Sequence, residues 1–196
     1  MPIFAFRSLV TSAMLAAIAP SLAAQGIVST MAAPDVTMGL IRDPALAAAI
    51  AEISATRIRE TDSTLVSFGT RHTMSDTVSN VRGIGAARRY LFAKLDGYSK
   101  ACGGCLHVEY DPALIEMRGH PDHPMVNVVN VLAWLPGRDT TRVLVMGGHY
   151  DSCICARTDL GPLARFEATQ DAPGADDDGS GASAVAAKTR LSAASS

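Results

Sequence analysis

Apolar residues along the chain follow two kinds of spacing, and each predicts a different type of element. Over residues 83–100 they recur every three to four positions, which is typical of a helix with one buried face. The residues of that face are Ile84, Ala87, Leu91 and Leu95. A helix is also predicted over residues 45–59, directly after the helix-start pair Asp43-Pro44.

Two later segments carry continuous apolar runs instead. Residues 125–135 (MVNVVNVLAWL) end at the turn signal Pro136-Gly137, and residues 142–146 (RVLVM) form a second run. Such runs are typical of strands that are buried on both faces between helices. A long loop over residues 153–176 then leads to a small-residue helix predicted from 179 to about 190. Helices followed by buried strands predict an α/β layered fold.

The first 24 residues have the layout of a secretory signal peptide. An apolar run over residues 9–18 follows Arg7 and precedes the small residues Ser21 and Ala23. The run is shorter than the about 20 apolar residues of a bilayer-spanning helix, which disfavours a membrane anchor. We therefore expect residues 1–24 to be removed, a periplasmic or secreted location, and no stable membrane insertion.

Composition suits one ordinary domain over residues 25–196. Of the 196 residues, 48% are hydrophobic and 18% are charged, and the formal net charge is −2. The basic residues are scattered, so no sustained positive field attracts phosphates, and nucleic acid is excluded as an expected partner.

Four cysteines fall in two close pairs, Cys102-Gly103-Gly104-Cys105 and Cys153-Ile154-Cys155. Disulfides are the first expectation in an exported protein, but the sequence does not choose among the three possible pairings. A structural zinc site of four thiolates is the alternative, which the tight C-x-C spacing and export disfavour. A redox role for the first pair is weaker, because that motif precedes the strand-like residues 106–110 instead of opening a helix.

The strongest candidate for metal chemistry is the segment Gly148-His149-Tyr150-Asp151-Ser152. His149 and Asp151 lie two positions apart at the end of a predicted strand, so both side chains can lie on one side. An imidazole nitrogen binds zinc, and a nearby carboxylate can fix its orientation. We interpret His149 as a ligand and Asp151 as its orienting partner, with an ordinary surface pair as the alternative.

A second segment, residues 172–181, contains the three successive carboxylates Asp176, Asp177 and Asp178. Adjacent negative charges repel one another unless water, a cation or backbone N–H groups compensate. They also precede a predicted helix start, where free N–H groups and the helix dipole favour negative charge. The acidic run is therefore either a solvated capping loop or the source of a carboxylate that bridges two metal ions.

The two segments together resemble the motifs of co-catalytic zinc aminopeptidases of metallopeptidase family twenty-eight. The resemblance covers most of residues 53–185, including Ser67-Phe68-Gly69-Thr70-Arg71. It implies that His149 binds one zinc ion and that Asp177 bridges both zinc ions of the site. It also implies that Asp151 is the catalytic-site carboxylate that orients His149.

The resemblance implies a three-layer α/β/α zinc-peptidase fold around a mixed central sheet, of which this chain carries about the first half. The implied activity is that of an exported metallo-aminopeptidase, which hydrolyses the N-terminal peptide bond of a peptide substrate with two zinc ions per complete site. The alternatives are a carboxypeptidase or glutaminyl cyclase of the same fold, or a non-catalytic exported remnant or binding module.

The segment after Asp178 departs from the family pattern. The family completes its site downstream with a Glu-Glu pair, an Asp and a His, but the sequence has no Asp, Glu or His beyond Asp178. A shifted reading frame or a truncated gene would explain this departure, and we expect the chain alone to be inactive.

The signal-peptide pattern makes a direct prediction about the mature protein. N-terminal sequencing of protein from its host is expected to give a start near Ala24 or Gln25, because the small residues at 21 and 23 mark the cleavage site. An intact Met1 on cytosolic protein would contradict it.

Overall fold

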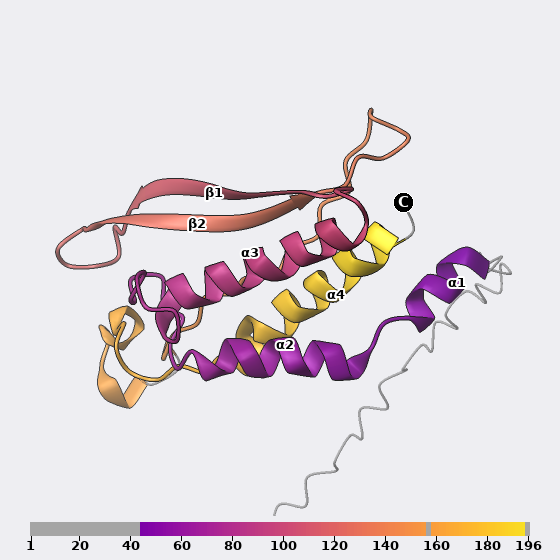
Figure 1. Cartoon of the computed structure of the whole chain (residues 1–196). Helices are drawn as coiled ribbons and strands as arrows, with labels where there is room; N and C mark the ends of the chain where they lie inside the picture. The colour runs from indigo at the N-terminus through magenta and orange to yellow at the C-terminus, as the bar shows by residue number, and fades with distance from the viewer. Residues whose placement is uncertain (1–43, 156–157, 195–196) are drawn as a thin grey trace, which may run out of the picture. The chain divides into compact units, whose positions relative to one another are not determined.

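The computed structural model describes residues 44–155 and 158–194, so the predicted signal peptide lies outside the described residues. Among the described helices, none combines the length and apolar character needed to cross a bilayer. The elements in chain order are α1 (Pro44–Ala51), α2 (Ala55–Ser67), α3 (Gly83–Ala101), β1 (His107–Glu116), β2 (Met125–Trp134), η1 (Thr158–Leu160), η2 (Ala164–Phe166), η3 (Ala175–Gly179) and α4 (Ser180–Ala194) (Figure 1).

The helix predicted over residues 45–59 is wrong in its bounds, because two helices occupy this region. Ser54 lies in an extended conformation at the start of α2, and its side chain accepts a hydrogen bond from the Arg57 N–H at 3.3 Å. A serine in this position satisfies a backbone donor at a helix start. The chain therefore starts a new helix at residue 55 and continues it to residue 67.

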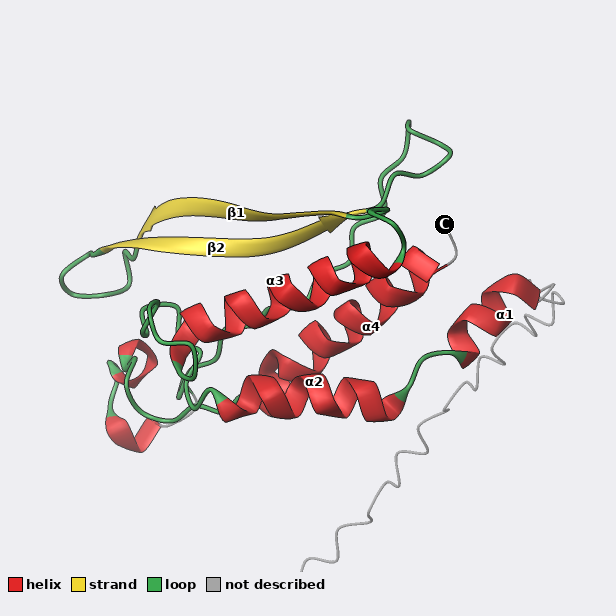
Figure 2. Cartoon of the chain, in the orientation of Figure 1, coloured by secondary structure: helices red, strands yellow, loops and turns green. Residues whose placement is uncertain are grey.

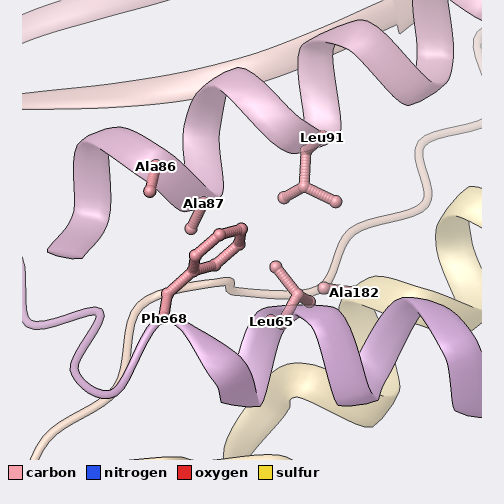
Figure 3. Close-up of a cluster of buried hydrophobic side chains, with 6 residues drawn as sticks. All are labelled: Leu65, Phe68, Ala86, Ala87, Leu91 and Ala182. Atoms are coloured by element: carbon pink, nitrogen blue, oxygen red, sulfur yellow. The ribbon is translucent and has the colours of Figure 1, made fainter. Parts of the chain in front are cut away.

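The hydrophobic core lies between α2, α3 and α4. Leu65 and Phe68, at the end of α2, face Ala87 and Leu91 of α3 (Figure 3). Ala182 of α4 belongs to the same cluster. The predicted buried face of α3 is confirmed, since all four of its apolar residues are buried. Burying a side chain such as that of leucine contributes about 1.5–3 kcal/mol, so these contacts hold the helices together.

Strands β1 and β2 form an antiparallel hairpin with Tyr110 opposite Val131. Figure 2 shows this hairpin beside α3. The ring of Phe92, from α3, stacks on Tyr110 with their centroids 4.5 Å apart. The buried hydroxyl of Ser99, near the end of α3, donates to the carbonyl of Leu106 at 2.6 Å, which fixes where the chain enters β1.

The strand predicted at residues 142–146 is wrong for the described structure. This segment makes no strand pairing, and Val143 and Leu144 are 73% and 87% exposed. A strand needs a neighbouring strand that hydrogen-bonds to its backbone N–H and C=O groups. The apolar run provides one strand of such a pair, and no described segment pairs with it. The described residues form one two-stranded sheet, so the α/β class holds while the three-layer arrangement stays a prediction.

The cysteines pair within each close motif. One disulfide joins Cys102 to Cys105 and the other joins Cys153 to Cys155. The alternative of a four-thiolate zinc site is therefore wrong, because all four sulfur atoms are used in these bonds. The second disulfide lies in the loop that directly follows Asp151 and Ser152.

Candidate metal centre

The imidazole of His149 lies between two carboxylates. Its Nδ1 atom is 3.1 Å from Oδ1 of Asp151, and its Nε2 atom is 3.1 Å from Oδ1 of Asp177. Asp177 comes from the far side of the long loop that follows the first motif. The structure thus brings together all three residues that the sequence singled out. The side chains of His149 and Asp177 are 55% and 86% exposed, so the ligand-facing side of the pair is open to solvent.

The start of α4 is joined to His149 by a different aspartate. Oδ2 of Asp178 accepts a hydrogen bond from the His149 backbone N–H at 3.2 Å, and Oδ1 accepts one from the Gly181 N–H at 3.1 Å. A carboxylate that accepts from the first turn of a helix is a typical N-terminal cap. The capping interpretation of the acidic run therefore applies to Asp178, while its neighbour Asp177 faces the imidazole. The peptide bond between these two aspartates is cis.

Gly148 allows the segment before His149 to approach α4 closely. A Cβ atom added at this glycine would lie 2.7 Å from the backbone nitrogen of Ala182 and 2.7 Å from the carbonyl carbon of Gly181. Both neighbouring atoms belong to the helix backbone, which has no rotamer by which to move aside. Glycine at position 148 is thus a geometric requirement of the contact between the two motifs.

A buried arginine, Arg71, connects both motifs to the end of α2. Its Nε–H donates to the carbonyl of Tyr150 at 2.7 Å, and its Nη2 donates to the carbonyl of Gly174 at 2.8 Å. Its Nη1 donates to the carbonyls of Leu65 and Pro173 at 3.0 and 2.5 Å. One fully buried guanidinium therefore fixes the backbone of three separate segments.

Ser152 adds a second link at the same place. Its hydroxyl oxygen accepts from the Arg71 backbone N–H at 3.0 Å, and the hydroxyl donates to the carbonyl of Ala172 at 2.6 Å. Burial lowers the pKa of Arg71, and the negative charges of Asp62 and Asp151 partly offset this effect. Sequence reasoning assigned no role to Arg71 or Ser152. The only signal was their position, since both fall within segments that carry the family resemblance.

The groups around His149 act on its pKa in opposite directions, and their balance shifts the imidazole towards its charged form. Partial burial lowers the pKa of His149, but the charge of the Asp151 carboxylate and its hydrogen bonds raise it, and the net pKa lies above its ordinary value. Burial raises the pKa of the adjacent Tyr150, whose hydroxyl donates to the Val129 carbonyl. Tyr150 therefore acts as a neutral hydrogen-bonding group that anchors the motif to β2.

The donor atoms of His149 and Asp177 fit part of a zinc site. An imidazole nitrogen and a carboxylate oxygen are both ordinary zinc ligands, and here they face each other with a solvent-accessible side. Within residues 44–155 and 158–194, however, no group of three or more His, Cys, Asp or Glu side chains could hold a metal ion. The described residues thus supply two donors, and a complete site needs about three or four.

Comparisons with known proteins agree with the two motifs. Residues 130–196 match the family model described as peptidase family M28. The chain is 40% identical over 148 residues to a probable zinc metalloprotease of Pyricularia oryzae, and 41% identical over 140 residues to a probable zinc metalloprotease of Pyrenophora teres f. teres. These matches cover 75% and 71% of this chain but 28% and 27% of the relatives. The chain thus spans little more than a quarter of their length. No solved structure gives a significant match.

Replacing Arg71 is expected to weaken the contact between the two motifs and to lower the stability of the fold. In Arg71→Met, four backbone carbonyls lose a fully buried donor, so the free energy of unfolding should fall by about 3–5 kcal/mol in urea denaturation followed by circular dichroism. Arg71→Lys should lie in between, because an ammonium group has only three donors.

The matched control is Arg118→Met, whose side chain is 84% exposed. This variant should change the unfolding free energy by no more than about 0.5 kcal/mol. Equal effects of the two Arg→Met changes would show that Arg71 does not hold the motifs together.

Proposed function

The chain belongs to peptidase family M28, and on that premise we propose that it contributes part of the zinc centre of an exported metallo-aminopeptidase. The observation that carries the proposal is the 3.1 Å approach of His149 Nε2 to Asp177 Oδ1. These two atoms come from the two motifs that resemble the family pattern, and both are zinc donors by chemistry.

Each residue of the centre has a separate role in this proposal. Zinc held at this centre would supply a Lewis acid for the scissile carbonyl and for an attacking water. His149, through Nε2, and Asp177, through its carboxylate, would hold the zinc. Asp151 accepts the Nδ1 proton of His149, which leaves the Nε2 lone pair for the metal. Asp178 holds the His149 backbone against the start of α4 and so keeps the imidazole beside Asp177.

The aminopeptidase specificity rests on the resemblance of both motifs to zinc aminopeptidases. The relatives in Pyricularia and Pyrenophora are named only as probable zinc metalloproteases. A peptide with a free N-terminus is therefore the proposed substrate, and a same-fold carboxypeptidase or cyclase is the outcome to be tested against it.

We also propose that the protein acts outside the cytoplasm. The signal-like pattern of residues 1–24 supports this location. The two disulfides are in keeping with it, because disulfides persist in oxidising compartments and are rare in the cytosol.

Zinc binding by residues 25–196 tests the assignment of the ligands. Competition with a chromophoric chelator should give weak binding to the unaltered chain, because only two donors converge. Loss of an outer-shell partner typically lowers metal affinity by about 10–100-fold. His149→Ala and Asp177→Asn each remove a direct ligand, so each should lower the zinc affinity by at least that much. His107→Ala is the control, since this exposed histidine lies at the start of β1. Equal zinc affinity in all four proteins would contradict the assignment.

Hydrolysis assays test the activity itself. Residues 25–196 alone are expected to release no residue from a peptide with a free N-terminal amine, because the described residues lack a complete ligand set. They also offer no assigned general base, and general-base assistance is typically worth about 10²–10⁴-fold in rate. A chimaera extended with the remaining segment of the Pyricularia oryzae relative should release N-terminal residues in a zinc-dependent manner, and should spare N-acetylated peptides. Cleavage from the C-terminus would instead favour the carboxypeptidase. Chelator-sensitive release by residues 25–196 alone would overturn the ligand set.

A further inference from the structure

Asp151 uses only one of its two carboxylate oxygens to contact His149. Oδ1 faces Nδ1 of the imidazole, and Oδ2 accepts a hydrogen bond from the hydroxyl of Thr73 at 2.9 Å. Thr73 follows the end of α2 by a few residues and is far from Asp151 in the sequence. All three side chains line the same cavity of about 160 Å³. The carboxylate is thus held between a hydroxyl on one side and the imidazole on the other.

The loop that carries Thr73 is fixed by the two buried residues that directly precede it, Arg71 and His72. Arg71 is bound by four backbone carbonyls, as described above. His72 is 5% exposed, its Nδ1 accepts from the Met74 N–H at 3.1 Å, and its Nε2 lies 2.8 Å from the carbonyl of Arg165. Because both ring nitrogens of His72 have partners, the backbone around Thr73 has little freedom. The Thr73 hydroxyl is therefore presented to Asp151 from a rigid position.

We propose that Thr73 is a positioning residue of the metal centre, which fixes the Asp151 carboxylate and through it the ring of His149. A carboxylate can rotate about its Cβ–Cγ bond when only one of its oxygens is bound. With the Thr73 hydroxyl on Oδ2, Oδ1 stays directed at Nδ1, and the proton of the neutral imidazole stays on Nδ1. Nε2 then keeps its lone pair directed towards Asp177. This inference deepens the proposed function, but its first readout needs no metal.

The experiment compares three variants at position 73 in residues 25–196. Long-range ¹H–¹⁵N spectra at alkaline pH report which nitrogen of a neutral histidine carries the proton, and the His149→Gln spectrum identifies the signals of His149. The unaltered chain and Thr73→Ser, which keeps the hydroxyl, should show the Nδ1–H form. Thr73→Val keeps the branched shape without the hydroxyl and should give a mixture with the Nε2–H form. Thr73→Ala gives the same readout if the valine variant does not fold.

The backbone carbonyl of Asp151 also lies 3.3 Å from His149 Nδ1, so it is a second acceptor for the Nδ1 proton. Thr73→Val leaves both acceptors of Asp151 in place, whereas Asp151→Ala removes the carboxylate. The fraction of the Nε2–H form should therefore rise in both variants, but less in Thr73→Val. Zinc affinity, measured by chelator competition, should fall by about 10-fold in Thr73→Val, at the low end of the effect of outer-shell partners, and Thr73→Ser should restore it.

Thr61→Val is the matched control for a purely structural effect. Thr61 is buried, and its hydroxyl donates to the Arg57 carbonyl within α2 and not to a residue of the centre. This variant should leave the His149 spectrum unchanged even if it lowers the urea midpoint. An unchanged Nδ1–H form in both Thr73→Val and Thr73→Ala would overturn the proposal. A shifted proton without zinc binding by any variant would support the positioning role and reject the proposed zinc function instead.

Discussion

The arrangement of this structure depends on one buried cation, the guanidinium of Arg71. Burying a charge is costly unless its hydrogen-bonding groups are satisfied, and here the four partners are all backbone carbonyls. They belong to the end of α2, to Tyr150 and to the Pro173-Gly174 turn. Because the bonds go to the main chain, they fix the paths of the loops and use none of the side chains that carry the chemistry. His149 and Asp177 therefore meet at the surface while the framework below them is buried.

The acidic run shows how neighbouring residues of one type divide two tasks. Asp178 lies three positions before Gly181, the spacing at which a side chain can cap the first turn of a helix, and it does so in α4. Asp177 has no such partner in the helix and instead faces His149. Two of the three adjacent charges are thus compensated differently, one by backbone N–H groups and one by the imidazole. Charge repulsion within the run is reduced by this division.

What the sequence could predict depended on whether a local pattern determines the structure. The buried face of α3 follows from the helix period alone, and Leu91 and Leu95 lie where that period requires. The pairing of His149 with Asp151 was predicted from a two-residue spacing at the end of a strand, and the two side chains do meet although residues 142–151 form no strand. Residues 142–146 have an equally clear strand pattern, but pairing depends on a neighbouring strand, which no local pattern supplies. The role of Arg71 could not be predicted, because one arginine in a loop has no periodicity and its partners are distant carbonyls.

The close approach at Gly148 limits how the metal centre can change. The segment before the histidine touches the main chain of α4, and main-chain atoms do not move aside as a side chain does. Even one methyl group would push the histidine segment away from α4, which directly follows the aspartates in the chain. The carboxylate of Asp177, by contrast, extends into open solvent. A variant that binds a larger or smaller ion could therefore move the carboxylate of Asp177. It could not move the backbone at Gly148 closer to α4, because an added Cβ atom there would already clash with the helix backbone.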